Sequence, residues 1–209
     1  MSTVDKIAYF QQRRDEVPNQ ELAQELAAKR DRAGIREIAD QLSNANTQIQ
    51  SDCLKVLYEV GYRDPALIAE YAPAFVNLLS SRNNRLVWGS MIALSTIATI
   101  KADELFQHTT AIKHAIERGS VITVDNGIKT LARIASSNLS YNQEIFPYLL
   151  RHLETCRPKD VPQHAEHIVV AVNSDNKRAF MAIVEQRSVG MPASRMARLR
   201  KVLKEAAQR

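Results

Sequence analysis

The chain has 209 residues, of which 45% are hydrophobic and 24% are charged, and its formal net charge is +5. This length suits a protein with a substantial core, and no apolar run is long enough for a membrane helix. The N-terminus lacks the basic-then-apolar order of a signal peptide. We therefore expect a cytoplasmic protein that does not bind membranes.

Residues 1–33 are predicted to form short N-terminal capping helices. Val4 and Ile7 indicate one helix that ends near Pro18, and Leu22 and Leu26 indicate a second. The terminal units of a repeat protein need a polar outer cap. We expect these helices to cover the exposed end of the first repeat.

Apolar residues recur at an interval of 37 positions between residues 34 and 187. Five columns of four residues follow this interval: Ile38, Phe75, Ile112, Leu149; Leu42, Leu79, Ile116, Leu153; Leu54, Met91, Ile128, Ala165; Leu57, Leu94, Leu131, Ile168; and Val60, Ile97, Ile134, Ala171. A fixed period of this length is typical of stacked units that cannot bury their apolar faces alone.

Each period is predicted to be a pair of helices. Its apolar positions are three or four residues apart, as on one helix face: Ile38 with Leu42, and Leu54 with Leu57 and Val60. Pro73 and Pro147 fall inside the first helices of their units, which we expect to be bent or divided. No stretch shows the sustained alternation of a β-strand.

Three predicted second helices resemble the second helix of a HEAT repeat. The resemblance is carried by Asn46, Ile49, Gln50, Cys53, Leu54, Val56, Leu57, Val60 and Gly61; by Asn83, Leu86, Ser90, Met91, Ala93, Leu94, Ile97 and Ala98; and by Thr123, Gly127, Ile128, Thr130, Leu131, Ile134 and Ala135. The chain departs from the family where an Arg is common, with Gln50, Val87 and Val124 in its place. The resemblance implies an all-α, right-handed solenoid of four or five degenerate HEAT-like helix pairs, of the armadillo type, in one domain of residues 1–209.

Residues 188–209 are predicted to form a basic C-terminal capping helix. This segment accounts for the whole formal net charge of the chain, because its only acidic residue is Glu205 and its basic residues are Arg195, Arg198, Arg200, Lys201, Lys204 and Arg209. An apolar stripe runs beside these charges through Met196, Leu199, Leu203 and Ala206. Two interpretations remain open: a cap whose cations face water, or a basic patch that binds nucleic acid or another acidic surface.

In a HEAT-like stack the second helices line the concave surface. A helical wheel places these residues outward on it: Gln48, Asp52, Lys55, Glu59, Arg85, Ile92, Ile122, Lys129, Arg133, Lys159 and Glu166, with Trp88 and Asp125 at the flank. Aromatic and Arg side chains dominate binding hot spots. The candidate partner-binding residues are therefore Arg85, Trp88, Ile92, Ile122, Asp125, Lys129 and Arg133. The alternative is that Trp88 packs laterally between neighbouring second helices.

The residues indicate no catalytic centre and no cofactor. The chain resembles the HEAT-like-repeat DNA glycosylases of alkylated purines, which place Trp, Asp and Arg on the concave surface. Trp88, Asp125 and Arg133 are the nearest candidates, but no local motif of that family surrounds them, so we assign no catalytic residue. The glycines are dispersed and form no phosphate-binding loop.

A metal site and a disulfide are both unexpected. His164 and His167 are three residues apart on a predicted helix, with Glu166 between them and Cys156 upstream in a turn. Transition-metal sites need three or four converging ligands, and we expect surface histidines without metal. Cys53 lies about three repeat units from Cys156, whereas a disulfide needs Cα atoms within about 7 Å.

The predicted function is a non-enzymatic scaffold or adaptor that binds a protein partner on its concave surface. Nucleic-acid binding, in part through the basic C-terminal helix, is the alternative. The oligomeric state stays open.

Overall fold

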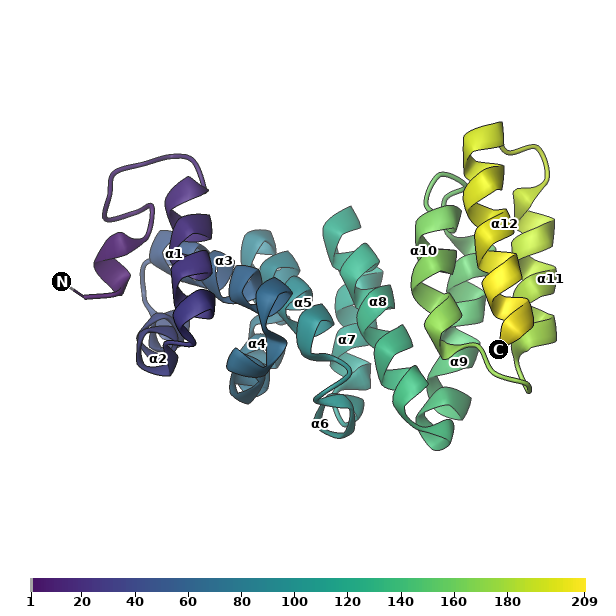
Figure 1. Ribbon diagram of the computed structural model, residues 1–209, viewed down its shortest axis with the longest axis horizontal. Coiled ribbons are helices and arrows are strands. Elements are labelled where there is room, and N and C mark those ends of the chain that lie inside the picture. Colours follow the sequence, from purple (N-terminus) through teal and green to yellow (C-terminus); the bar gives the residue numbers. More distant parts are fainter. Residues whose placement is uncertain (1) are drawn as a thin grey trace. The chain divides into compact units, whose positions relative to one another are not determined.

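The computed structural model describes residues 2–209, and in this part of the chain the regular elements are all helices (Figure 1). The α-helices are α1 (Val17–Lys29), α2 (Arg32–Asp40), α3 (Thr47–Arg63), α4 (Ala72–Leu78), α5 (Asn84–Ile97), α6 (Ala102–Phe106), α7 (Thr109–Arg118), α8 (Val121–Ser137), α9 (Leu139–Thr155), α10 (Val161–Ile168), α11 (Lys177–Ser188) and α12 (Ala193–Gln208). Short 3₁₀ helices are η1 (Val4–Lys6), η2 (Gln41–Ser43), η3 (Pro65–Leu67), η4 (Ala69–Tyr71) and η5 (Val169–Ala171).

The chain divides into two compact units, Met1–Gly127 and Ile128–Arg209, and the division falls inside α8. The first unit holds the N-terminal segment and the helix pairs up to the first part of α8. The second unit holds the rest of α8 and α9 to α12. Among residues 2–209, no helix has both the length and the apolar character needed to cross a membrane.

The second helices of the first three repeats begin at a regular interval. α3, α5 and α8 start at Thr47, Asn84 and Val121, which are 37 residues apart in both steps. Asn46 and Asn83 cap α3 and α5, and each side chain accepts a 2.9 Å hydrogen bond from the backbone N–H two residues later. α10 begins at Val161, so the fourth second helix does not keep the interval.

All twenty residues of the five apolar columns are buried. Leu57, Leu94, Leu131 and Ile168 are fully buried, and the most exposed column member, Leu79, is 8% exposed. The predicted apolar faces of the helices are therefore the faces that pack, and each compact unit buries its own members of the five columns. Burial of this apolar surface is the main favourable contribution to folding.

The first helices are divided where the chain bends. The predicted break at Pro73 takes the form of η3, η4 and α4, with Pro73 near the start of α4. A proline is accommodated there because the first helical residues have no intrahelical N–H partner. The third unit is divided as well, into α6 and α7, without a proline. α9 instead continues through Pro147.

α12 packs in the second unit against α10 and α11 (Figure 1). Leu199, Val202 and Ala206 are its buried residues. The predicted stripe is thus rotated slightly, because Met196 and Leu203 are only half-buried and Val202 takes a core position. The geometry of α12 is that of a helix covering its neighbours with one face.

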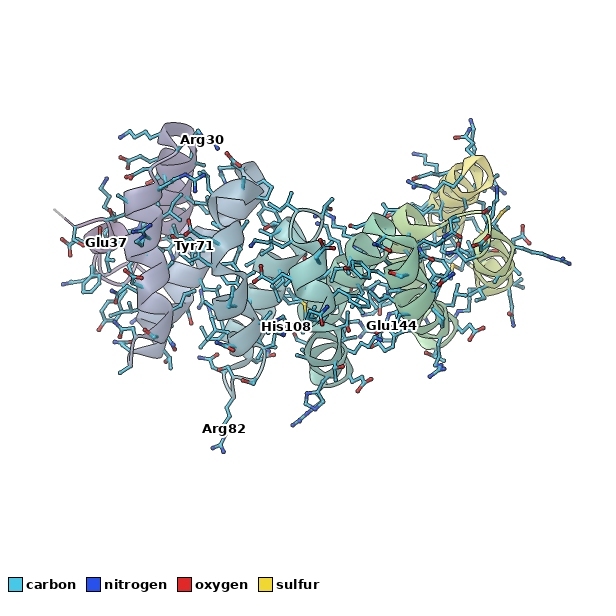
Figure 2. The ribbon with its side chains drawn as sticks, turned by 90° about the horizontal axis from the view of Figure 1, so that it is seen from below. Arg30, Glu37, Tyr71, Arg82, His108 and Glu144 are labelled. Atoms are coloured by element: carbon cyan, nitrogen blue, oxygen red, sulfur yellow. The ribbon has the colours of Figure 1, made fainter. Side chains whose placement is uncertain are left out.

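Exposed charged side chains surround the repeats. Figure 2 shows the Arg82 side chain extending from the turn between α4 and α5. This residue is exposed and lies away from the second-helix face described below.

Candidate functional site

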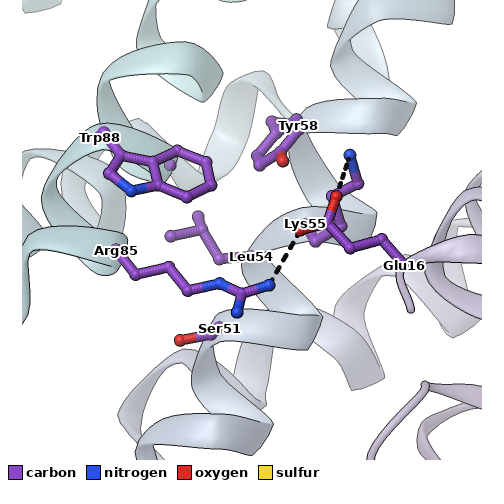
Figure 3. A pocket seen from close by; sticks show the side chains of 8 residues that line it. Glu16, Ser51, Leu54, Lys55, Tyr58, Arg85 and Trp88 are labelled. Carbon is purple, nitrogen blue, oxygen red and sulfur yellow. Dashed lines mark hydrogen bonds and ion pairs between the residues drawn. The ribbon is translucent and has the colours of Figure 1, made fainter. Parts of the chain in front are cut away.

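A small hollow, too shallow to hold a water molecule, lies on the second-helix face of the first unit. Eight residues line it (Figure 3): Glu16, Ser51, Leu54, Lys55, Tyr58, Arg85, Trp88 and Gly89. They come from the segment before α1, from α3 and from α5. Gly89 permits the close approach of the two helices, because a Cβ there would lie 2.8 Å from Leu54 Cδ2. The sequence thus places Trp88 directly beside α3.

Trp88 packs on Tyr58 and keeps part of its surface open. The two ring centroids are 6.3 Å apart at an angle of 57°, and Tyr58 also meets Tyr62 edge-on at 6.1 Å. Tyr58 is buried, whereas Trp88 is half-buried and Tyr62 is 52% exposed. Burial raises the pKa of Tyr58 to about 12. Lateral packing and partial exposure therefore occur together at Trp88, and the hollow has an aromatic wall.

A chain of ion pairs forms the other wall of the hollow. Glu16 accepts from Arg85 at 2.9 Å and from Lys55 at 3.0 Å, and Lys55 also pairs with Glu59 at 2.9 Å. The Lys55 ammonium lies 4.9 Å from the Tyr58 ring centroid, within cation–π range. Burial lowers the pKa of Lys55, but the hydrogen bonds to Glu59, Tyr58 and Glu16 outweigh it, and the net shift is upward.

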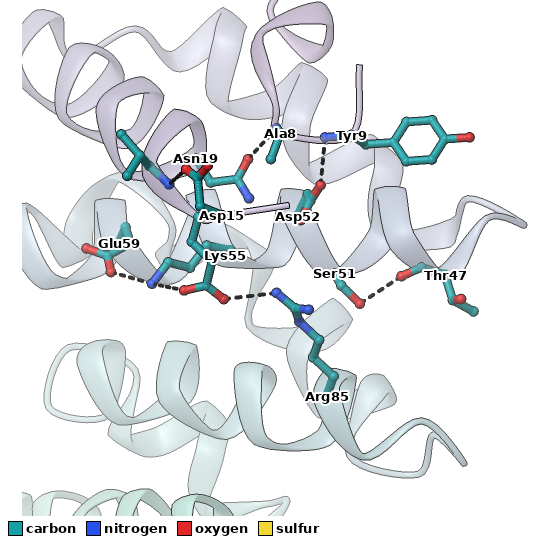
Figure 4. Close-up of polar contacts among 12 residues, drawn as sticks. Ala8, Tyr9, Asp15, Asn19, Thr47, Ser51, Asp52, Lys55, Glu59 and Arg85 are labelled. Atoms are coloured by element: carbon teal, nitrogen blue, oxygen red, sulfur yellow. Dashed lines mark hydrogen bonds and ion pairs between the residues drawn. The ribbon is translucent and has the colours of Figure 1, made fainter. Parts of the chain in front are cut away.

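The N-terminal segment covers the outward face of α3. The backbone N–H of Tyr9 donates to Asp52 at 2.9 Å, and the N–H of Ala8 donates to the side chain of Asn19 in α1 at 2.9 Å (Figure 4). The expectation that Asp52 and Lys55 face outward was wrong, since they are only 3% and 6% exposed. The helical wheel considered the neighbouring repeat alone, whereas α1 and the segment before it pack on this face as well.

The expectation that Ile92 faces outward was wrong. Ile92 is only 7% exposed, because α8 lies on that side of α5. Two contacts show the proximity: Ser95 Oγ is 3.3 Å from Asn126 Oδ1, and a Cβ added to Gly127 would lie 3.5 Å from Met91 Cε.

The remaining candidates lie along α8. Ile122 is 43% exposed and Asp125 is half-buried in the first unit. Lys129 and Arg133 belong to the second unit and lie on one face of α8, four residues apart. Burial lowers the pKa of Lys129, with the charge of Arg133 adding to it, and burial also lowers the pKa of Arg133. Lys129 and Arg133 thus form a half-buried pair of like charges.

The basic residues of α12 differ in their surroundings. Arg198 donates to both Glu166 carboxylate oxygens, at 2.7 and 2.6 Å, and this hydrogen bonding lowers the pKa of Glu166. Arg200, Lys201 and Lys204 are exposed, and Arg195 is half-buried. The predicted basic patch therefore contains one arginine whose charge is already neutralised.

The expectation of surface histidines was wrong for His164, which is 1% exposed. His152 of α9 lies 2.9 Å from His164 of α10, measured from Nε2 to Nδ1. Cys156 joins these two residues. Burial raises the pKa of Cys156 to about 11, although the nearby Arg187 guanidinium opposes that shift. Cys53 and Cys156 are both free thiols, as expected.

No family model matches the sequence, and no curated protein matches it. Solved structures do match. An engineered protein has a TM-score of 0.71 and 14% identity over 100% of this chain and 98% of its own. A designed armadillo repeat protein in complex with the peptide (KR)4 has a TM-score of 0.70 and 14% identity, over 90% of this chain and 86% of its own.

Kap121p bound to Pho4p has a TM-score of 0.68 and 12% identity, and the match covers 93% of this chain but only 22% of Kap121p. At such identities the similarity concerns the fold alone. The chain has the all-α fold of the armadillo and HEAT-like repeat proteins.

Proposed function

We propose that this chain is a non-enzymatic repeat scaffold whose second-helix face binds a segment of a protein partner. The observation that carries the proposal is the pair of Trp88 and Arg85 on α5, which combine partial exposure with positions fixed by Tyr58 and Glu16. Aromatic and arginine side chains anchored in this way are the usual energetic centres of protein interfaces. Two structures of the same fold support the class of ligand, since one holds the peptide (KR)4 and the other Pho4p.

The charges on the face indicate the character of the segment. Arg85 is 42% exposed and already holds one carboxylate, that of Glu16. A guanidinium in this position can pair with a further carboxylate from a partner. We therefore propose that the segment is acidic, in contrast to the basic (KR)4 peptide of the designed protein, and that it carries an aromatic or apolar residue that packs on the exposed part of the Trp88 ring.

The fluorescence of Trp88 gives a direct test, because it is the only tryptophan of the chain. An acidic peptide with a central Phe should change the emission of Trp88 on titration, with an affinity that falls as salt rises. The basic peptide (KR)4 should leave the emission unchanged. The variant Arg85→Ala should bind the acidic peptide at least about tenfold more weakly, as expected for the loss of a charged contact.

Arg82→Ala is the matched control, since Arg82 is an exposed cation in a turn outside this face. It should bind like the unaltered protein. Equal affinity for the acidic and basic peptides, or an undiminished affinity of Arg85→Ala, would refute the proposed face. Salt-sensitive binding of a DNA duplex that is lost in Arg200→Ala, Lys201→Ala and Lys204→Ala, without peptide binding, would replace the proposal with nucleic-acid recognition.

A further inference from the structure

Three side chains with metal-ligating atoms converge in the second unit, and none of them belongs to the proposed face. His152 lies in the last turn of α9, Cys156 is the residue that ends this helix, and His164 lies in α10. Their ligand atoms all lie within 4.8 Å of one another. The ring centroids of His152 and His164 are 4.7 Å apart.

We propose that His152, Cys156 and His164 bind a zinc ion, with a water molecule as the fourth ligand. One thiolate and two imidazoles are the donor types that zinc prefers in tetrahedral sites. They do not suit magnesium or calcium, which take oxygen ligands. The proposal is independent of the partner-binding face, since it uses none of its residues.

The donor spacings, 2.9 Å between the two nitrogens and at most 4.8 Å among all three atoms, bracket those of a tetrahedral site. Zn–N bonds of about 2.0–2.1 Å and a Zn–S bond of about 2.3 Å place neighbouring donor atoms roughly 3.3–3.6 Å apart. His152 Nε2 and His164 Nδ1 are 2.9 Å apart and share a proton in a hydrogen bond. A small rotation of the two rings, with that proton moved to the other nitrogen of its own ring, would let both nitrogens face one ion.

The backbone around Cys156 is held in place. The guanidinium of Arg187, from α11, donates to the carbonyl oxygens of Glu154 and Cys156. The Cys156 N–H donates to His152 O at 2.8 Å, which closes the last turn of α9. The position of the thiol relative to His152 is thus set by the helix and by Arg187 before any ion binds, as an ion site requires.

The cluster is sheltered on one side and open on the other. His164 is 1% exposed, whereas His152 and Cys156 are half-buried. The open side offers an entry path for the ion and room for the water ligand. A bound ion would tie the end of α9 to α10 across the turn of residues 157–160.

Cobalt(II) and zinc titrations of the full chain test the proposal. Cobalt should bind with a stoichiometry of one per chain and give a thiolate-to-cobalt charge-transfer band together with the intense visible bands of a tetrahedral site. Zinc should displace it and should raise the melting temperature, because an ion that binds only the folded state stabilises it. Absence of the charge-transfer band with cobalt in excess would overturn the proposal.

Variants separate ligands from neighbours. Cys156→Ser and His152→Gln should each weaken zinc binding by more than about 100-fold, since even outer-shell losses cost about 10- to 100-fold. Both residues are half-buried, so these chains are expected to fold, which circular dichroism can verify. His167→Gln is the matched control, because His167 lies on the same helix as His164 but outside the cluster. Unchanged zinc affinity in Cys156→Ser, or an equal loss in His167→Gln, would contradict the assignment.

Discussion

Glu16 and Arg85 lie 69 residues apart in the sequence, yet Glu16 Oε1 accepts a 2.9 Å hydrogen bond from Arg85 Nη2. The carboxylate comes from the segment before α1 and the guanidinium from the second helix of the next repeat. The same carboxylate also pairs with Lys55 of α3. The N-terminal segment therefore supplies one acidic side chain to the face on which we propose that an acidic partner binds.

Glu16→Gln should strengthen the binding of an acidic peptide, because it frees Arg85 from its intramolecular carboxylate. We expect about a two- to tenfold lower Kd by Trp88 fluorescence, and a loss of stability of no more than about 1 kcal/mol, since Glu16 and Arg85 are 39% and 42% exposed. Glu25→Gln, which removes the pairs with Lys6 and Lys29 elsewhere, should leave the Kd unchanged. Weaker binding by Glu16→Gln would show that Glu16 itself contacts the partner.

Truncation of equivalent leucines in the apolar columns should lower the free energy of unfolding by similar amounts. Leu57→Ala and Leu131→Ala each remove a fully buried side chain, one in each unit. Each should lower the free energy of unfolding by about 2–5 kcal/mol, from lost burial and the cavity left behind. Urea denaturation measures the change. Leu139→Ala, at a position that is 57% exposed, should stay within about 0.5 kcal/mol. A small loss at Leu57 would mean that it is not part of a packed seam.

The core could be predicted from the sequence because it depends on a local and repeated pattern. Leu94 is buried for the same reason as Leu57, since each occupies the equivalent position in its own helix pair. The start of α3 and of α5 could be predicted from Asn46 and Asn83. Their side chains cap these helices through local hydrogen bonds that do not depend on how the helices pack.

The candidate sites could not be predicted from the sequence to the same extent as the core, because they depend on where non-repeated segments lie. The repeat pattern of α3 does not show that the N–H of Tyr9 donates to Asp52, or that the N-terminal segment buries this residue. His152 and His164 meet only because the turn after α9 brings α10 back alongside it, and helical spacing within one helix cannot reveal that pair.

Gly89 should resist substitution because of helix packing. A Cβ at this position would lie 2.8 Å from Leu54 Cδ2 and 3.1 Å from Leu54 Cγ. Gly89→Ala gains about 1 kcal/mol of helix propensity, but Leu54 must move, and overpacking costs typically about 1–3 kcal/mol. We expect a net loss of stability and a shift in Trp88 emission, since the two helices must separate. Gln48→Ala, at an exposed position of α3, should change neither. A more stable Gly89→Ala variant would show that Leu54 adapts without cost.

Asp52 and Glu59, both on α3, should respond to pH with opposite signs. Burial raises the pKa of Asp52 above its ordinary value of 3.8, against the hydrogen bond from the Tyr9 N–H. The folded chain then holds this proton more tightly than the unfolded chain, so the contribution of Asp52 to stability falls as pH rises through the folded pKa. Asp52→Asn, which is neutral throughout, should gain stability relative to the unaltered protein between about pH 3 and pH 7.

Glu59 provides the contrasting case. Burial raises its pKa, but the hydrogen bonds from Lys55 and Arg63 outweigh burial and bring the pKa below its ordinary value of 4.5. Its contribution to stability is present above that value and is lost as pH falls through the folded pKa. Glu59→Gln should therefore lose stability relative to the unaltered protein as pH rises over the same range. Urea denaturation of the three proteins at each pH measures both differences. Slopes of the same sign would show that one of the two carboxylates is not in the environment described. The slopes differ in sign because burial outweighs the nearby charges and hydrogen bonds at Asp52, whereas the two cationic partners outweigh burial at Glu59.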